Sequence, residues 1–482
     1  MDSSLTKKTM GGFLWLGGVK AANVIFQFAI LAILARLLSP SEFGLIGLAL
    51  IVISLSEIFN DMGFGPAVTQ KKDLSQIDYS TAFYGSIIFG LIVVAVVQLS
   101  AHQLALFFRN ADLEVVLRII SIVILLNAIK AVPLGYMYRE MQYKLLALIQ
   151  ISSYVLGYGL AGITLAYLGY GVWALVYAVI AHTLMSLLLY FFLNKKKPNF
   201  GFSWQSFISL LHFGGGYSLS KIFSFAANKG DRILVGRLLG VESLGHYERG
   251  FQVVRHATGL FGEIIDKVLF SPLARKQDDR KRIGEIYLEL SYLLAIIFFP
   301  FSGFVAVNAE AIVNILLGSQ WQQTVELVQI LSFSIFFVIC TRIGSTVAKS
   351  LGDVYRRAWR TLFYAVYILV SVYITSQHWG VIGATYAVAF GSVVNYFLAF
   401  EQTRRLTKIS YINWFKSHIY GLGLLIIYAY ISYALFNFVI DIGLYLQFIA
   451  NIFLFVFLLA LGVSLEPKKV LREYISKVYN KA

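Results

Sequence analysis

Lysine and arginine recur at positions deep inside apolar stretches of this sequence. The six candidates are Lys20, Lys130, Lys221, Arg249, Arg255 and Arg342. A charge near the middle of a membrane helix costs about 2.5–3.5 kcal/mol on insertion scales, so each should face a cavity or a partner. The planar fork of arginine also suits phosphate oxygens. The set predicts a cavity for an anionic group, and the alternatives for its members are snorkelling to the interface or structural ion pairing.

Two carboxylates and one glycine run are further candidates. Glu57 and Asp61 lie four residues apart, hence on one helix face, and could bind a proton or a cation. A polar helix end capped by water explains them equally well. Gly214, Gly215 and Gly216 interrupt an apolar stretch and predict a hinge, or else close helix packing by small residues.

The residue patterns that enzymes use are missing from the sequence. It contains no Ser/His/Asp or Cys/His grouping, no GxxxxGK[ST] phosphate loop and no metal-ligand spacing, and Cys340 is its single cysteine. We therefore expect no catalytic residue, no cofactor and no bound metal. The protein is predicted not to be an enzyme.

Composition indicates which elements must position these residues. Hydrophobic residues make up 58% of the 482 residues and charged residues only 13%, about half the charge of a soluble domain. Apolar runs of about twenty residues, each long enough to cross the hydrocarbon core as a helix, alternate with short charged breaks. The predicted fold is an all-α polytopic membrane protein with about fourteen transmembrane helices, near residues 12–35, 43–66, 81–104, 114–137, 147–168, 171–193, 207–229, 245–270, 286–307, 324–348, 360–377, 380–402, 417–438 and 443–463. The seventh and eighth carry many charges, which must face a wet interior if those spans are helical.

Basic residues predict the orientation of these spans. Alternate breaks hold 27 of the 40 Lys and Arg, whereas the opposite breaks hold only Arg109 and Arg237. The positive-inside rule places both termini in the cytoplasm. It also explains the net charge of +15 without a nucleic-acid partner. The expected location is the bacterial inner (plasma) membrane.

An internal repeat predicts how the spans are grouped. Residues 35–44 match 236–245 at an offset of 201, with Lys221 answering Lys20, and 171–179 match 380–388 at an offset of 209. Chance similarity between apolar segments is the alternative. Two parallel lobes of six helices are typical of transporters that bind a substrate between the lobes. The expected domains are an N-terminal six-helix lobe at 1–197, an interfacial linker at 198–206, a second six-helix lobe at 207–405, two extra helices at 406–463 and a basic tail at 464–482 that anionic lipids attract.

The N-terminal block also resembles a known family. Gly12-Phe13-Leu14-Trp15, the run from Ala35 to Gly44 and Asp61-Met62-Gly63-Phe64-Gly65 are similar to the start of Wzx-type polysaccharide flippases. The colanic, teichuronic and O-antigen exporters are relatives of these flippases. All belong to the multidrug/oligosaccharidyl-lipid/polysaccharide exporter superfamily. The resemblance covers essentially the whole chain and does not identify the sugar.

The resemblance implies a transporter that flips an undecaprenyl-diphosphate-linked oligosaccharide from the cytoplasmic to the periplasmic leaflet by alternating access. The expected partners are this lipid-linked oligosaccharide, membrane lipids and a polysaccharide polymerase. The six cations would then hold the diphosphate, and Glu57 or Asp61 would couple an ion. A cation-coupled drug or metabolite antiporter on the same fold is the alternative, and it predicts a cavity dominated by acidic residues. A membrane glycosyltransferase would need large periplasmic loops, and every predicted periplasmic break is short.

Overall fold

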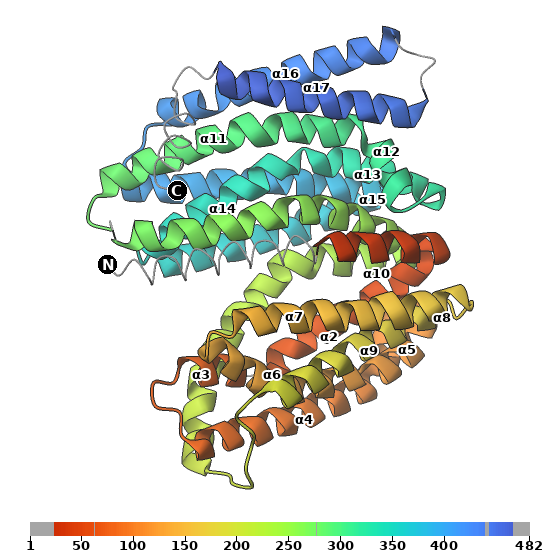
Figure 1. The fold of residues 1–482 in the computed structure, drawn as a ribbon, viewed down its shortest axis with the longest axis vertical. Helices are drawn as coiled ribbons and strands as arrows, with labels where there is room; N and C mark the ends of the chain where they lie inside the picture. The colour runs from red at the N-terminus through yellow and green to blue at the C-terminus, as the bar shows by residue number, and fades with distance from the viewer. Residues whose placement is uncertain (1–23, 62, 276, 439–442, 466–482) are drawn as a thin grey trace. The chain divides into compact units, whose positions relative to one another are not determined.

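The computed structural model describes residues 24–61, 63–275, 277–438 and 443–465, and every regular element in these ranges is a helix (Figure 1). The prediction of an all-α fold is confirmed for this part of the chain. A first helix, Val24–Leu37, precedes the labelled elements. The others are α2 (Pro40–Asp61), α3 (Phe64–Gln70), α4 (Gln76–Phe108), α5 (Asp112–Ile120), α6 (Ile122–Arg139), α7 (Tyr143–Tyr154), the π-helix η1 (Val155–Gly162), α8 (Ile163–Tyr167), α9 (Val172–Leu193), α10 (Trp204–Arg275), α11 (Arg280–Val307), α12 (Ala309–Leu316), the 3-10 helix η2 (Ser319–Trp321), α13 (Gln322–Ser332), α14 (Ser334–Ser350), α15 (Val354–Thr407), α16 (Tyr411–Phe438) and α17 (Leu444–Ser464).

Nine helical segments of the described chain are long and apolar enough to cross a membrane. A tenth span arises if the pair Ser319–Ser332 and Ser334–Ser350, bent by 46°, crosses as one. The protein is therefore a multi-pass helical membrane protein, and the total of fourteen spans stays a prediction.

Two long helices each contain a break where a pair of spans was predicted. In α10 the break is at Gly240, with φ 86°, and in α15 it is at Trp379 and Gly380, with φ 58° at Gly380. Positive φ is readily adopted only by glycine, which explains why the chain turns at these residues. α10 is absent from the nine apolar segments, as expected from the charges in the seventh and eighth predicted spans.

One helix is longer than its apolar run because of a capping box. α4 begins at Gln76 instead of near residue 81, since Ser75 accepts a hydrogen bond from the Asp78 backbone and Asp78 accepts one from the Ser75 backbone. Such reciprocal bonds satisfy two of the unpaired N–H groups at a helix start.

The chain divides into two compact units. The first contains Met1–Gly245 and Leu316–Gln320, and the second contains His246–Ile315 and Trp321–Ala482. The boundary thus falls inside α10, close to its break at Gly240. The division into lobes at 198–206 stays a prediction.

The start of α4 holds the loop that follows α9 in the first unit. The backbone N–H groups of Asn199 and Ser203 donate to the hydroxyls of Ser80 and Thr81, each at 2.9 Å. The hydroxyl of buried Tyr79 donates to the carbonyl of Lys196 at 3.1 Å. The predicted linker is therefore fastened to this helix along much of its length.

The two repeated blocks contact each other reciprocally within the first unit. A Cβ atom added at Gly44 in α2 would overlap the carbonyl oxygen of Val241 in α10, and one added at Gly245 would overlap the carbonyl oxygen of Pro40. At the offset of 201, residue 40 corresponds to 241 and residue 44 to 245. Small residues allow such close approach of helix backbones in membranes, and the reciprocity is what an internal repeat predicts.

A short segment from late in the chain completes the first unit. The side-chain amide of Gln320 donates to the carbonyls of Ala35 and Leu38, at 3.0 Å for Leu38. These carbonyls lie at the C-terminal end of the helix Val24–Leu37, where helices take donors from outside their own hydrogen-bond ladder. Gln320 therefore caps a helix that lies far away in the sequence.

The second unit is built around α11, which packs against α14 and α16. A buried cluster near one end includes Tyr287, Ile343 and Phe400. The Nε2 atom of His418 lies 2.6 Å from the Tyr396 hydroxyl, so α16 is fastened to α15 by a buried polar contact. Figure 1 shows α16 and α17 side by side.

Candidate functional site

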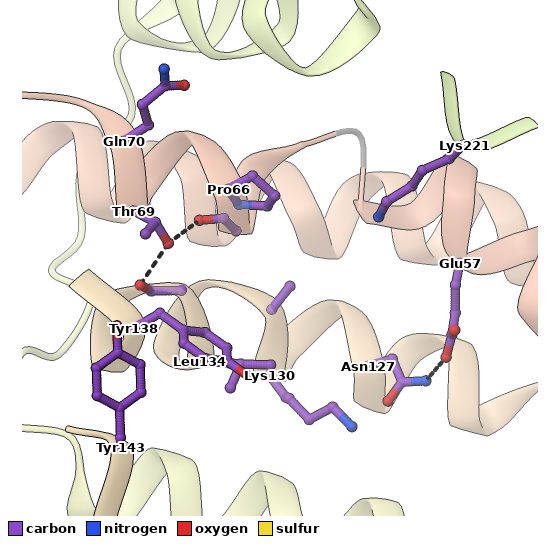
Figure 2. A pocket seen from close by; sticks show the side chains of 13 residues that line it. Glu57, Pro66, Thr69, Gln70, Asn127, Lys130, Leu134, Tyr138, Tyr143 and Lys221 are labelled. Carbon is purple, nitrogen blue, oxygen red and sulfur yellow. Dashed lines mark hydrogen bonds between the residues drawn. The ribbon is translucent and has the colours of Figure 1, made fainter. Parts of the chain in front are cut away.

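A cavity of about 690 Å³ lies within the first unit (Figure 2). Five helices contribute to it, namely α2, α3, α6, α7 and α10. Its lining consists of Glu57, Gly65, Pro66, Thr69, Gln70, Asn127, Lys130, Ala131, Leu134, Gly135, Tyr138, Tyr143 and Lys221.

α6 supplies one wall of this cavity. Asn127, Lys130, Leu134 and Tyr138 are spaced by three or four residues, which places them along one face of a helix. The charged and polar groups of this wall come one turn apart. The helical periodicity of α6 therefore places the amide of Asn127 and the ammonium group of Lys130 in the same cavity.

The short helix α3 lies against α6 and forms a second wall. Thr69 donates its hydroxyl to the carbonyls of Gly135 at 2.8 Å and Gly65 at 3.1 Å. A Cβ atom at Gly135 would lie only 3.0 Å from the Cα of Gly65. Gly63 turns the chain between α2 and α3 with φ 73°. Glycine at these positions lets α3 cover α6 closely.

A hydrogen bond fixes the carboxylate of the cavity. Asn127 Nδ2 donates to Glu57 Oε1 at 2.6 Å (Figure 2), a charge-assisted bond between α6 and α2. The Oδ1 atom of the same amide is buried without a hydrogen-bond partner among the described residues. That oxygen is an acceptor suited to a ligand hydroxyl.

Two ammonium groups reach the cavity from different helices. Lys130 comes from α6 and Lys221 from α10, and both side chains are half-buried. The charge of Glu57 acts on Lys130. Among the described lining residues, two positive charges stand against one negative charge. The cavity can therefore attract an anion while the carboxylate limits the strength of that attraction.

The structure brings three of the predicted site residues together in this cavity, which are Lys130, Lys221 and Glu57. Lys20 and the side chain of Asp61 lie outside the described residues. Gly214, Gly215 and Gly216 fall within the bounds of α10, but their surroundings are outside the description. Their hinge role, and the ion-coupling role of Glu57 and Asp61, stay predictions.

The three predicted arginines belong to the second unit. Arg255 is exposed and pairs with Glu248 at 3.6 Å, and Arg249 donates to the side chain of Gln252. Arg342 packs its guanidinium against Gly262. None of the three lines the cavity of the first unit. Their contact with substrate stays a prediction.

Sequence reasoning missed the uncharged polar residues of the cavity. Asn127 and Thr69 carry no charge, so the search for buried cations passed over them. The available signal was the position of Asn127, a lone amide in an apolar run three residues before Lys130. Within the part of the chain that the structure describes, no group of three His, Cys, Asp or Glu could hold a metal ion.

Comparison with solved structures identifies the class of fold. The chain matches the lipid II flippase MurJ, in its inward closed conformation, with a TM-score of 0.77 and 13% identity over 95% of this chain and 100% of that one. It also matches an inward-facing multidrug resistance MATE family transporter of the MOP superfamily, with a TM-score of 0.59 and 16% identity over 80% of this chain and 96% of that one. The protein thus has the fold of MOP-superfamily membrane transporters.

Sequence comparison places the chain within a family. The model described as polysaccharide biosynthesis protein matches residues 33–326, and the chain belongs to this family. It is 25% identical to the teichuronic acid biosynthesis protein TuaB of Bacillus subtilis, over 86% of each chain. It is 24% identical to the lipopolysaccharide biosynthesis protein WzxC of Escherichia coli, over 82% of this chain and 81% of the relative. The predicted resemblance to polysaccharide-transport proteins is confirmed.

Proposed function

We propose that this protein flips an undecaprenyl-diphosphate-linked oligosaccharide from the cytoplasmic to the periplasmic leaflet, for export of cell-surface polysaccharide. The observation that carries the proposal is the joint presence of Lys130 and Lys221 in one cavity of a multi-pass helical membrane protein. The family and the names of its members agree with this substrate class. No covalent reaction is needed, because the protein has only to shield a charged headgroup from hydrocarbon.

The side chains of the cavity fit a diphosphate that must be bound and then released. Each ammonium group can donate charge-assisted hydrogen bonds, worth about 1.5–3 kcal/mol apiece. Glu57 lowers the net positive charge of the cavity and so weakens the hold on the anion. Asn127 keeps this carboxylate in place at 2.6 Å. Moderate affinity is what a transporter requires, since tight binding would trap the substrate.

Alternating access between two parallel six-helix lobes is the mechanism we propose for movement across the membrane. The internal repeat and the reciprocal contact of Gly44 and Gly245 support it. Both termini lie in the cytoplasm in this proposal, which follows the distribution of Lys and Arg. A polysaccharide polymerase as a partner stays a prediction.

The competing function is that of a cation-coupled drug or metabolite antiporter. That function predicts an acidic cavity, because its cargo and its coupling ion are both positive. The described lining holds Glu57 as its single acid beside two lysines. The balance of charge therefore favours an anionic substrate.

The test is genetic and biochemical. The gene is deleted in its host, and lipid-linked oligosaccharide is quantified in each leaflet with a membrane-impermeant glycosidase added to spheroplasts. Complementation uses the wild type, the double variant Lys130→Gln/Lys221→Gln, and Lys72→Gln as a matched control, since Lys72 is exposed and outside the cavity.

We expect the deletion to accumulate oligosaccharide that the glycosidase cannot reach. Wild type and Lys72→Gln should reverse this accumulation and the double variant should not. Reversal by the double variant would retain the function and refute the cavity. Absence of accumulation, together with new sensitivity to cationic drugs, would refute the flippase and favour the antiporter.

A further inference from the structure

A second cavity, of about 440 Å³, adjoins the first and has different chemistry. Its lining consists of Gln27, Lys130, Leu134, Gln150, Ser153, Tyr154, Tyr158, His182, Ser186 and Tyr190. Amides, hydroxyls and aromatic rings dominate this set, and no carboxylate lines the cavity among the described residues. Such a lining offers many hydrogen-bond donors and acceptors but little charge. It suits an uncharged, hydroxyl-rich ligand better than a cation.

Three aromatic rings form one wall of this second cavity. Tyr154 and Tyr158 stack with centroids 4.8 Å apart and an interplanar angle of 27°. His182 lies edge-on to Tyr154 at 6.0 Å and tilted to Tyr158 at 5.8 Å. All three side chains remain partly exposed. Aromatic faces carry partial negative charge, and the C–H groups on one face of a pyranose ring carry partial positive charge, so this wall matches a sugar.

The backbone beneath the aromatic wall is a π-helix. η1 covers Val155–Gly162. π-helical turns are rare in proteins overall, and those that occur are often found at functional sites. Gly157 in η1 approaches α9 so closely that an added Cβ would lie 2.5 Å from the backbone nitrogen of His182. This close packing sets the distance between the tyrosines and His182. The wall is therefore held by the backbone.

The two cavities share part of their lining. Lys130 and Leu134 line both of them. A diphosphate held beside Lys130 in the first cavity would present its attached sugar toward the second. The volume of about 440 Å³ lies within the usual range of roughly 300–1,000 Å³ for ligand pockets.

We infer that the second cavity is the subsite for the uncharged pyranose residues joined to the diphosphate, with Tyr154 and Tyr158 as the stacking platform. This inference rests on the proposed function and adds to it the part of the substrate that each cavity contacts. Buried Ser153 and Ser186 line this cavity but donate their hydroxyls to backbone carbonyls of their own helices, which leaves their oxygen atoms as acceptors for a sugar hydroxyl. The ammonium group of Lys130 marks the junction between sugar and diphosphate.

The test measures how much a sugar adds to binding. The full-length protein in nanodiscs is titrated calorimetrically with geranyl diphosphate and with geranyl diphosphate linked to glucose, galactose or N-acetylglucosamine. The variants are Tyr154→Leu, Tyr158→Leu and the milder Tyr154→Phe. Tyr167→Leu is the matched control, because Tyr167 is 80% exposed in α8 and outside the cavity. Thermal unfolding establishes that each variant is folded.

We expect at least one sugar to tighten binding to the wild type, and each leucine variant to lose roughly 3- to 10-fold of that gain. Tyr154→Phe should keep most of the gain, and binding of geranyl diphosphate itself should be unchanged in all variants. Equal binding with and without sugar would refute the subsite while leaving the diphosphate cavity intact. A gain that survives both leucine variants would also refute the subsite. No binding of any probe would refute the proposed function itself.

Discussion

Alanine at Gly44 or Gly245 should destabilise the protein, because each Cβ would meet the backbone of the opposite helix. The obstacle in each case is a main-chain carbonyl, of Val241 and of Pro40 respectively. A carbonyl cannot rotate away as a side chain can, so α2 and α10 must separate until the carbon–oxygen contact reaches at least 3.4 Å.

The expected cost follows from three contributions. Overpacking of this kind costs about 1–3 kcal/mol, and the severity of the overlap places it near the upper end. Helix–helix contacts of this closeness commonly contain Cα–H···O bonds, and the loss of one adds about 0.5–1 kcal/mol. Alanine has a higher helix propensity than glycine, which offsets about 1 kcal/mol of this destabilisation. We therefore expect each single variant to lose about 2–3 kcal/mol in the free energy of unfolding.

The double variant gives the sharper test, because the two contacts are reciprocal. Separation of the helices by the first alanine relieves the clash of the second, so the double variant should cost at least 1 kcal/mol less than the sum of the singles. The free energy of unfolding is measured by SDS titration in mixed micelles with circular dichroism. Gly423→Ala in α16 is the control, because no atom lies within 4 Å of its added Cβ, and it should be neutral or stabilising. Single variants that behave like this control would refute the contact, and strictly additive costs would refute its reciprocity.

Three further predictions concern other contacts. Arg139 donates to the carbonyl of Lys72 at 2.8 Å. Loss of this charge-assisted bond, worth about 1.5 kcal/mol, should favour local opening, so Arg139→Ala should speed tryptic cleavage after Lys72 in detergent about tenfold while other sites are cut at their usual rate. An unchanged rate would show that Arg139 does not hold this loop. His418→Phe should cost about 1–3 kcal/mol of unfolding free energy because the Tyr396 hydroxyl loses a buried partner at 2.6 Å. Tyr396→Phe also removes the acceptor of Trp414 Nε1, so it should cost less in the His418→Phe background than in the wild type, where both bonds are lost; equal costs in the two backgrounds would argue against the bond. Glu57→Gln should tighten pyrophosphate binding roughly 5- to 30-fold in calorimetry, since removing one negative charge from the lining is worth about 1–2 kcal/mol at an effective dielectric constant near 20. Weaker binding would show that the carboxylate does not oppose the anion.

Helices were the most predictable part of this protein. Apolar runs predict them directly, because a chain in lipid must satisfy its backbone groups internally. The start of α4 was placed too late because the capping box of Ser75 and Asp78 is polar and extends the helix beyond the apolar run. Hydropathy averages report burial in lipid and carry no information on how a helix is capped.

The site was predictable only where a charge interrupted an apolar run. Lys130 and Lys221 were found because a buried charge is costly and therefore conspicuous. Asn127 was missed since an amide has no comparable cost, although its bond to Glu57 fixes the carboxylate. The cavity role of Arg255 stays a prediction, and the structure adds an ion pair with Glu248 on the same helix, seven residues or two turns earlier. The seven-residue spacing of Glu248 and Arg255 is visible in the sequence, so an ion pair within one helix should be considered before a cavity role is assigned to a charged residue.

The cap that Gln320 provides also constrains the order in which this protein is made. The carbonyl of Leu38 receives its donor from a residue 282 positions later in the chain. At about 5–20 residues per second, a ribosome needs roughly 15–60 s to bridge that interval. The first unit is therefore completed only after residues 246–315 of the second unit have been synthesised. The same connection means that a chain divided into two separately expressed halves must still exchange the segment Leu316–Gln320 before the first unit is complete.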